Sequence, residues 1–497
     1  MNYNNKMGGG LMQLVSYGAQ DVYISGNPQI TFWKILYKRH TNFAVESIEV
    51  TFNGQADFNK RVTAVINRNA DLMYKTYLQV VLPQISNAPG AHWVHYIGHQ
   101  LINQVEVEIG GQRIDRQYGD WMQIWTQLAT EAGSIRALNA LVGQTADLQF
   151  PTVPTGVAPP APCSSSGGLR SCQQLSALPA KTLYVPLQFW FCRNPGVAIP
   201  LIALQYHEVR INVEFNPLQL CLVSGINNGI SVNQVSASLA AASLYVDYCY
   251  LDTEERRRFA QQSHEYLIEQ VQYTGAESIT SSSNKIQLNF NHPVKELFWV
   301  VQRDSFVDCS ATSEIALYLG IQPFNYSDDW DVSAYSNMVY ANEEINQNGT
   351  DAVVTSDPAE SGLSLGNQSA LFLLGKALLE MDIRCDGGNP VEVAKLQLNG
   401  QDRFTEREGS YFDKVQPYQH HCRTPSTGIN CYSFALRPEE HQPSGTCNFS
   451  RIDKATLQLT VSVRTVKDQN TAQVRVYALN YNVLRVMSGM GGLAYSN

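Results

Sequence analysis

The residues most capable of chemistry in this sequence are a serine between two glycines and several histidines near cysteines. Gly362, Ser364 and Gly366 form a Gly-x-Ser-x-Gly motif, which is the nucleophile elbow of many hydrolases. That chemistry requires a strand before the serine, a helix after it and a parallel sheet around both. The helix-like stretch Ser369–Met381 does follow, but Ser356-Asp357-Pro358 would interrupt a preceding strand. We therefore interpret Ser364 as a loop serine and predict that the protein is not an enzyme.

Two groups of histidines could in principle bind a metal ion. His92, His95 and His99 have helical spacing, but no carboxylate or thiol joins them at a suitable interval. A denser group of potential ligands comprises His420, His421, Cys422, Cys431, His441 and Cys447. The spacing of this second group fits no zinc module. We expect structural roles for both groups, and we predict no catalytic, cofactor-binding or metal site.

Other short motifs are also better explained without ligands. Gly489-x-Gly491-x-x-Ala494 resembles a dinucleotide-binding loop, but the sequence ends too soon for the helix that such a loop requires. Asp328-Asp329-Trp330-Asp331 could hold calcium, although a solvated acidic loop is the simpler interpretation. Asparagines that begin Asn-x-Ser/Thr triplets occur at Asn325, Asn348, Asn367 and Asn448. Glycosylation there would need secretory processing, which the polar start of the sequence argues against, and the question stays open.

The composition indicates a large folded protein made in the cytosol. The 497 residues are 44% hydrophobic and 16% charged, which suits two domains of roughly 200–250 residues each. Ten cysteines are scattered without a Cys-x-x-Cys pair, as in a protein from a reducing compartment. No apolar run approaches the roughly 20 residues that a membrane-spanning helix needs.

The net charge of −9 is unevenly distributed. The segment 304–375 contains eleven Asp or Glu residues and no Lys or Arg, and we expect it to form an exposed acidic loop. Residues 1–40 instead carry a local charge of +3. Nothing resembles the basic stripe of a nucleic-acid-binding protein, so we expect no direct contact with nucleic acid.

Alternating and β-branched runs predict an all-β protein. Strands are expected at Ser47–Asn53, Arg61–Asn67, Tyr74–Leu82, Gln104–Ile114, Leu183–Phe191, Glu208–Phe215, Ser243–Leu251, Tyr266–Tyr273, Lys285–Asn291, Val294–Gln302, Val391–Leu398, Ile429–Leu436, Ala455–Val466 and Ala472–Val486. Helical pattern is sparse and is clearest at Asp120–Glu131 and Asp252–Gln262, and the second marks the domain boundary. Many strands joined by turns indicate antiparallel sandwiches or barrels.

The two halves also repeat each other weakly. A strand leads into a Gly-Gln turn at Glu108–Arg113 and again at Gln397–Asp402. Segments around Pro195 and Pro443 each precede a strand by fourteen residues. These matches predict two copies of one β-fold, interrupted by the Pro/Ser/Gly-rich insertion 144–181 and the acidic insertion 304–375.

Four blocks resemble one known family, the major capsid proteins of nucleocytoplasmic large DNA viruses, particularly the chlorella-virus and giant amoeba-virus branch. They are Gly8–Phe32, His292–Val301, Glu439–Asp453 and Tyr481–Ala494. Both insertions lack such a match, and Cys422 and Cys431 look particular to this sequence.

The resemblance implies a double jelly roll, meaning two eight-stranded antiparallel sandwiches side by side with few short helices and long outer loops. The expected organisation is an arm over 1–40, a first jelly roll over 41–251, a connecting helix over 252–263 and a second jelly roll over 264–497. It also implies homotrimers that form pseudo-hexagonal capsomers and tile an icosahedral virion shell. Expected partners are neighbouring capsomers and minor capsid and penton proteins. The arm either packs under the jelly rolls, or contacts minor capsid proteins or an internal membrane surface, or does both. Assembly is expected in the host cytoplasm.

A second hypothesis is a jelly-roll protein that binds host glycans through its outer loops. Glycan binding uses aromatic platforms beside polar groups, and Trp330, Tyr335 and Tyr340 could supply them. This hypothesis predicts strong glycan binding that is abolished by deleting Ser327–Tyr340 while shell assembly stays intact.

Overall fold

The computed structural model describes most of the chain, as two compact units. The described residues are 9–86, 91–149, 152–154, 172–174, 177–223, 237–308, 320–331, 387–466 and 470–495. The units are Met1–Asn42 and Phe43–Asn497. The described part of the first unit contains helices α1 (Gly9–Val15) and α2 (Val22–Ser25), separated by the short 3-10 helix η1 (Ala19–Asp21). None of the helices described is long and apolar enough to cross a membrane.

The second unit begins with a sandwich of two antiparallel sheets. The first sheet has the order β1-β15-β3-β11, with β12 (Ile199–Pro200) paired to β3, and the second has the order β2-β13-β6-β7. The bounds are β1 (Phe43–Thr51), β2 (Arg61–Ile66), β3 (Leu72–Leu82), β6 (Ile102–Ile109), β7 (Gln112–Tyr118), β11 (Lys181–Pro186), β13 (Val209–Phe215) and β15 (Ala241–Leu251). Burial alternates along β2, where Val62, Ala64 and Ile66 face the core. That alternation is the period-2 pattern visible in the sequence.

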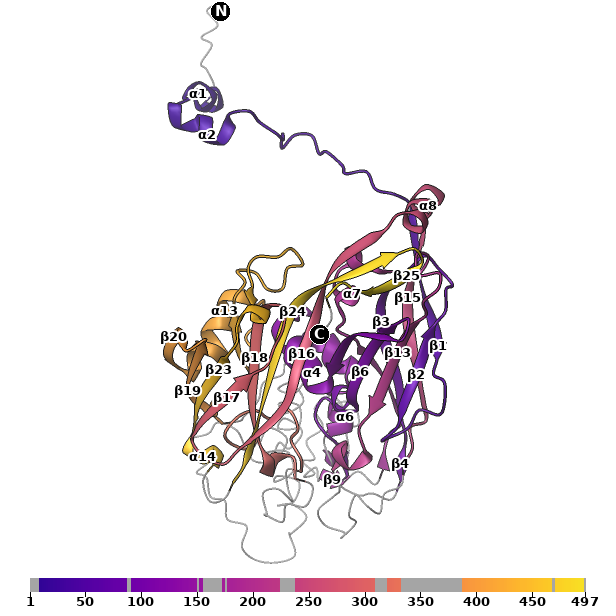
Figure 1. Ribbon diagram of the computed structural model, residues 1–497, viewed down its shortest axis with the longest axis vertical. Helices are drawn as coiled ribbons and strands as arrows, with labels where there is room; N and C mark the ends of the chain where they lie inside the picture. Colours follow the sequence, from indigo (N-terminus) through magenta and orange to yellow (C-terminus); the bar gives the residue numbers. More distant parts are fainter. Residues whose placement is uncertain are drawn as a thin grey trace, which may run out of the picture. The chain divides into compact units, whose positions relative to one another are not determined.

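A second sandwich follows, beside the first (Figure 1). Its sheets have the orders β16-β24-β18-β21 and β17-β23-β19-β20, with short strands β22 (Cys447–Asn448) and β25 (Met490–Leu493) added to the first. The bounds are β16 (His264–Ile279), β17 (Ser283–Leu288), β18 (Pro293–Arg303), β19 (Val391–Leu398), β20 (Gln401–Glu408), β21 (Asn430–Ser433), β23 (Ala455–Val461) and β24 (Ala472–Met487). The long strands β16 and β24 run side by side at the centre of the unit (Figure 1).

The two sandwiches have the same topology. When these principal described strands are counted from one to eight in each, both sandwiches read 1-8-3-6 in one sheet and 2-7-4-5 in the other. This order, with all pairs antiparallel, is that of a jelly roll. The all-β double jelly roll predicted from the sequence is therefore confirmed.

The repeated Gly-Gln turn is the same hairpin in both jelly rolls. It joins strands four and five, which are β6 and β7 in the first and β19 and β20 in the second. Its central residues have positive φ in both: 59° and 81° at Gly110 and Gly111, and 50° and 80° at Asn399 and Gly400. Two-residue turns with both φ values positive match the twist of paired strands, which is why glycine and asparagine occur there.

Several predicted elements differ at their ends. Leu183–Phe191 is not one strand: β11 ends at Pro186, and helix α7 (Trp190–Arg193) follows. Ala455–Val466 likewise ends as a strand at Val461 and continues as the short helix α14 (Val463–Val466). Strand β20 was not predicted as a strand because its residues are mostly charged and exposed, as on a sheet edge.

Both predicted helices are formed. Helix α4 (Gly119–Ala129) is nearly all buried, with Trp121, Ile124, Trp125 and Leu128 in its apolar face. Helix α8 (Thr253–Gln261) has no buried residue and connects β15 to β16, with the Asp252 side chain accepting a hydrogen bond from the Thr253 backbone N–H. The position of α8 explains its polar sequence, since it is a solvated link between the jelly rolls.

The acidic insertion is not wholly an exposed loop. In its described part, Gln322–Asp328 is buried, and the side chains of Gln322 and Asn325 hydrogen-bond each other. Residues 309–319 and 332–375 of the insertion lie outside the described residues. The expectation of an exposed acidic segment is thus wrong for 322–328, because its polar groups bond to one another and to β18.

Candidate functional site: the junction of the two jelly rolls

The described residues of the second unit form three hydrophobic cores, and the smallest is built around aromatic residues of both jelly rolls. In this shared core, Trp121 and Trp125 of α4 meet Phe298 of β18 and Tyr477 of β24. Trp121 is completely buried, with its ring 5.7 Å from that of Trp125, 5.1 Å from Phe298 and 5.8 Å from Tyr477. Such aromatic contacts bury much area and have preferred geometries. The junction is therefore packed like a domain interior and connects the two jelly rolls.

A buried group of charges lies beside the aromatic core. Glu269 of β16 is paired with Arg193 of α7 at 2.9 Å and with Lys295 of β18 at 2.6 Å. The side chain of Lys295 is 1% exposed and that of Glu269 is 7% exposed. Burial lowers the pKa of Lys295, and the Glu269 carboxylate opposes that shift. Because Arg193 belongs to the first jelly roll, this charge group also joins the two halves.

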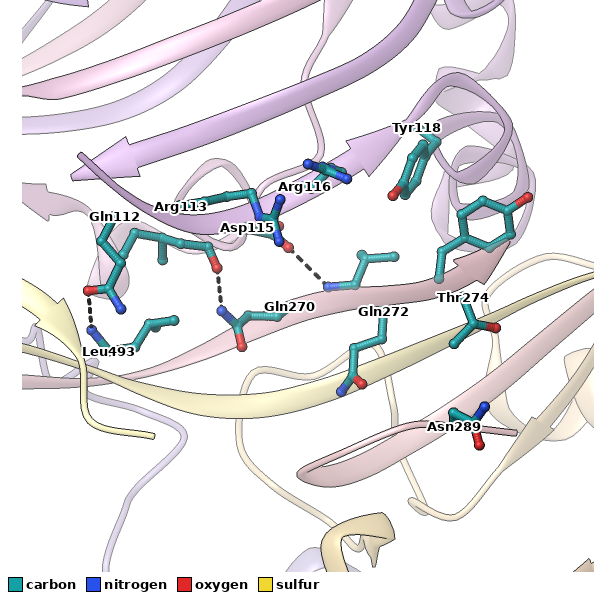
Figure 2. Close-up of a pocket in the computed structure, with 13 residues that line it drawn as sticks. Gln112, Arg113, Asp115, Arg116, Tyr118, Gln270, Gln272, Thr274, Asn289 and Leu493 are labelled. Atoms are coloured by element: carbon teal, nitrogen blue, oxygen red, sulfur yellow. Dashed lines mark hydrogen bonds between the residues drawn. The ribbon is translucent and has the colours of Figure 1, made fainter. Parts of the chain in front are cut away.

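A polar groove of about 400 Å³ opens between β7 and β16 (Figure 2). On its floor, a carboxylate oxygen of Asp115 accepts a hydrogen bond from the Val271 backbone N–H at 3.1 Å, and the Gln270 side chain donates to the Ile114 carbonyl. Burial raises the pKa of Asp115 to about 7, although its hydrogen bonds and Arg193 oppose that shift. Asp115 therefore changes its protonation near neutral pH in the folded protein.

We predict that Asp115 makes stability depend on pH between about 4 and 7. The carboxyl group has a pKa near 4 in the unfolded chain, so in that window the unfolded chain has lost a proton that the folded protein still holds. The contribution of Asp115 to the free energy of unfolding therefore falls as the pH rises. Asp115→Asn should remove this dependence, and its stability relative to wild type should rise by on the order of 2–4 kcal/mol between pH 4 and pH 8. Urea unfolding at both pH values measures the difference. An equal difference at both would contradict the raised pKa.

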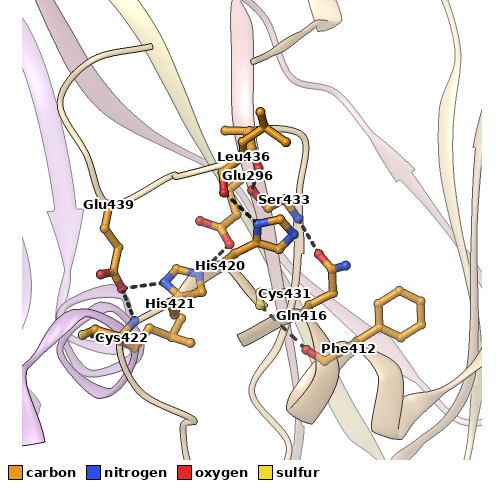
Figure 3. A network of polar contacts seen from close by, with 12 residues as sticks. Glu296, Phe412, Gln416, His420, His421, Cys422, Cys431, Ser433, Leu436 and Glu439 are labelled. Carbon is orange, nitrogen blue, oxygen red and sulfur yellow. Dashed lines mark hydrogen bonds and ion pairs between the residues drawn. The ribbon is translucent and has the colours of Figure 1, made fainter. Parts of the chain in front are cut away.

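A second polar network surrounds His421, in the loop after helix α13 (Gln416–His420) (Figure 3). The His421 ring lies between two carboxylates: Nε2 is 2.6 Å from Glu296 and Nδ1 is 2.9 Å from Glu439. Burial is the largest single influence and would lower the pKa of His421, but the Glu296 charge and the hydrogen bonds with Cys431, Glu296 and Glu439 together raise this pKa well above its ordinary value. The thiol of Cys431 also bonds to the ring.

The first histidine group does not converge on a common point. The Nδ1–H of His99 donates to the Gln123 side-chain oxygen at 2.7 Å, whereas His95 bonds to the Gln144 side chain at 2.8 Å. Burial lowers the pKa of His99 to about 4, so His99 is a neutral core residue. His92 lies on the short strand β5 (His92–Trp93) instead.

The second group is only partly brought together. Among the described residues, His421 and Cys431 meet with Glu296, which sequence spacing did not suggest. His420 instead bonds to the Leu436 carbonyl at 3.1 Å, and the Cys422 thiol to the Leu128 carbonyl at 3.4 Å.

The remaining motifs have structural explanations where they are described. Gly489 forms the β24–β25 turn, so no dinucleotide loop exists there. In the acidic run, Asp328 accepts from the Gly388 backbone N–H at 2.7 Å and Asp329 pairs with Arg464 at 3.5 Å. Trp330 packs its ring on Phe306 at 4.7 Å.

Some motif residues lie outside the described part or are buried. Ser364, Tyr335, Tyr340, Asn348 and Asn367 are outside the described residues. Asn325 is 2% exposed, which leaves its side chain no room for a sugar.

Sequence reasoning missed Glu269, Arg193, Lys295 and Glu296. A signal was available, because Lys295 and Glu296 interrupt the apolar strand β18, and a charge in a strand buried on both faces must be paired. The sequence does not reveal the partners, since Glu269 and Arg193 are 76 residues apart.

Two identical jelly-roll topologies joined by a packed junction define the class of double jelly-roll proteins. Two family models match consecutive parts of the chain: "major capsid protein N-terminus" over residues 31–252, and "large eukaryotic DNA virus major capsid protein" over residues 255–492. The chain belongs to the major capsid proteins of large eukaryotic DNA viruses.

Individual relatives agree with the family models. The chain is 59% identical to the major capsid protein of Phaeocystis pouchetii virus and 40% identical to that of Paramecium bursaria Chlorella virus 1, in each case over 99% of this chain and the whole relative. Among solved structures, a quasi-atomic model of the PBCV-1 virus capsid is similar with a TM-score of 0.66 and 34% identity. That match covers 94% of this chain and 100% of the other. The chain is therefore a structural protein of a virion.

Proposed function

We propose that three copies of this chain form a capsomer, and that capsomers tile the icosahedral shell of a large double-stranded DNA virus. Three double jelly rolls would give six similar sandwiches around a three-fold axis, which is a pseudo-hexagonal outline. Such tiling requires each chain to present its two jelly rolls at a constant angle. The shared aromatic core and the Glu269 charge group supply that rigidity, and this single observation carries the proposal.

The surface of the first jelly roll supports self-assembly. Strand β1 is an edge strand, paired only with β15 among the described strands, and nearly all of it is exposed. It presents Phe43 at 63% and Val45 at 51% exposure. An open strand edge with apolar side chains promotes association with another chain. The proposed role of this surface is structural rather than catalytic. Minor capsid and penton proteins are proposed as further partners of the capsomer, and assembly is proposed to take place in the host cytoplasm.

The mass of the protein in solution tests the capsomer. We expect light scattering to give three times the chain mass of 55.4 kDa, unchanged on dilution through the micromolar range. A monomer that remains folded at all concentrations would contradict the proposal. The Asp115→Asn variant is a suitable control and should have the same solution mass as wild type, because the groove that contains Asp115 lies within one chain.

We also propose that the amino-terminal arm anchors the capsomer to inner capsid components or to an internal membrane surface. The described arm exposes large apolar side chains, including Tyr23 at 94%, Phe32 at 89% and Trp33 at 95%. Aromatic residues with neighbouring Lys34 and Lys38 suit an interfacial or protein partner.

Replacing Phe32 and Trp33 together by serine should reduce incorporation into particles without affecting folding. The physical reason is that neither residue belongs to any of the three cores, while both offer apolar area to a partner. We expect at least a several-fold loss relative to wild type when both proteins are expressed together and virions are analysed by mass spectrometry. Equal incorporation with an unchanged solution mass would refute the anchoring role.

A further inference from the structure

A buried cluster of three different ligand types lies where the loop after α13 meets strands β18 and β21 (Figure 3). His421, Glu296 and Cys431 each offer one ligand atom, and these atoms lie within 4.8 Å of one another. The side chains of His421 and Glu296 are 0% exposed, and Cys431 is buried. Within the part of the chain that the structure describes, this is the one group of three or more such residues that comes together in this way.

The polar atoms of this cluster are incompletely satisfied by the protein. Oε1 of Glu296 bonds to His421, but Oε2 is buried and has no hydrogen-bond partner among the described residues. The thiol of Cys431 makes only a long contact, 3.7 Å to the Phe412 carbonyl, besides its bond to the His421 ring. Buried carboxylate oxygens are normally paired, so an unpaired one beside an imidazole and a thiol is available as a ligand for a cation.

The orientation of the His421 ring is that of a metal-binding histidine. Its Nδ1 atom donates to Oε1 of Glu439 at 2.9 Å, which directs Nε2 toward Glu296 and Cys431. Histidine ligands usually donate their other ring N–H to a carboxylate in this way, and the carboxylate fixes the tautomer and the ring plane. Glu439 therefore corresponds to the outer carboxylate of a carboxylate–histidine–metal arrangement.

We propose that Glu296, His421 and Cys431 bind a zinc ion. A nitrogen, a thiolate sulfur and a carboxylate oxygen suit Zn²⁺, whereas Mg²⁺ and Ca²⁺ prefer oxygen ligands alone. The second oxygen of Glu296 or a water molecule would complete a tetrahedron. Binding would release the proton on Nε2 of His421 and the thiol proton of Cys431. Two positive charges would thus leave as two arrive, and the net charge of the buried cluster would not change.

The position of the site indicates a structural role. The zinc ion would connect β18, β21 and the loop after α13, and Glu439 extends this connection to the segment that precedes β22. His421 also faces the other jelly roll, with its ring 6.3 Å from that of Trp125. Structural metal binding contributes directly to folding stability. The zinc ion would therefore stabilise the second jelly roll at the junction.

The purified full chain tests the proposal through its metal content and spectrum. We expect elemental analysis of protein purified without chelator to find one zinc ion per chain. A chelator should lower the melting temperature, and added Zn²⁺ should restore it. Titration of the metal-free protein with Co²⁺ should produce the near-ultraviolet thiolate-to-cobalt charge-transfer band.

Three variants assign the ligands. Cys431→Ser should abolish the cobalt band, whereas the neighbouring Cys422→Ser should retain it, because the Cys422 thiol lies outside the cluster. Glu439→Gln should weaken zinc affinity about 10- to 100-fold, as is usual for an outer carboxylate, and it provides a test if Cys431→Ser does not fold. Folding of each is checked by solution mass and circular dichroism. Folded wild-type protein with neither zinc nor a cobalt band, or an unchanged band in folded Cys431→Ser, would overturn the proposal.

Discussion

Replacing Glu269 by glutamine is expected to destabilise the protein by about 3–5 kcal/mol. The substitution preserves size but removes the one negative charge shared by Arg193 and Lys295. Both cations would then lie close together with little access to water, and neither could regain its hydration. Urea unfolding followed by circular dichroism measures the loss. A change below about 1 kcal/mol would show that the charge group contributes little to the junction.

Two control variants separate the missing charge from the altered shape. Lys295→Met leaves the pair between Arg193 and Glu269 intact, so it should cost less than Glu269→Gln. Combining both substitutions should recover part of the loss, because only one buried cation then remains unpaired. Strict additivity of the two effects would contradict a direct interaction between Glu269 and Lys295.

Replacing Trp121 by alanine is expected to cost about 3–5 kcal/mol and to uncouple the two jelly rolls. Trp121 is fully buried and contacts Trp125 in its own helix and both Phe298 and Tyr477 in the other jelly roll. Removing the indole would leave a cavity and would eliminate the ring contacts that Trp121 makes at the centre of the shared aromatic core. We expect the variant to unfold in two resolved calorimetric steps, one for each jelly roll. The wild type should unfold more cooperatively, because its two halves are more strongly coupled.

Trp93→Ala is the matched control for this experiment. Trp93 is equally buried but belongs to the core that is formed mainly by the first jelly roll. Its loss should destabilise that jelly roll by a similar amount without weakening the junction itself. If Trp121→Ala and Trp93→Ala gave identical unfolding profiles, a specific coupling role for Trp121 would be refuted.

Much of the fold could be predicted because strands leave a local signal. The alternation at Arg61–Asn67 and the helical spacing of Trp121, Ile124, Trp125 and Leu128 are each contained in one short segment. Element ends were less predictable. The segment that contains Phe189 and Phe191 has a strand-like composition, yet packing places Phe191 in helix α7. Strand β20 carries mainly charged residues, so only pairing with β19 reveals it.

The candidate site was far less predictable than the fold. The dense group from His420 to Cys447 was interpreted as scaffold, and the structure separates His420 and Cys422 from the others. It also brings His421 and Cys431 to Glu296, which lies 125 residues before His421 in the sequence. No sequence-spacing rule predicts contacts over so long a separation, because these residues meet only when β18 pairs with β21.

The sequence by itself determined the all-β class, the duplication and the family, because these depend on residue patterns within single segments. The Gly-Gln turns at Gly110-Gly111 and Asn399-Gly400 needed no structure to be matched. Only the tertiary structure decided which groups meet at the junction, where Glu269 binds Arg193 and Lys295, and where His421 lies between Glu296 and Glu439. The physical reason is that two sandwiches bring together side chains far apart in sequence, and a charge is stable there only if packing supplies its partner.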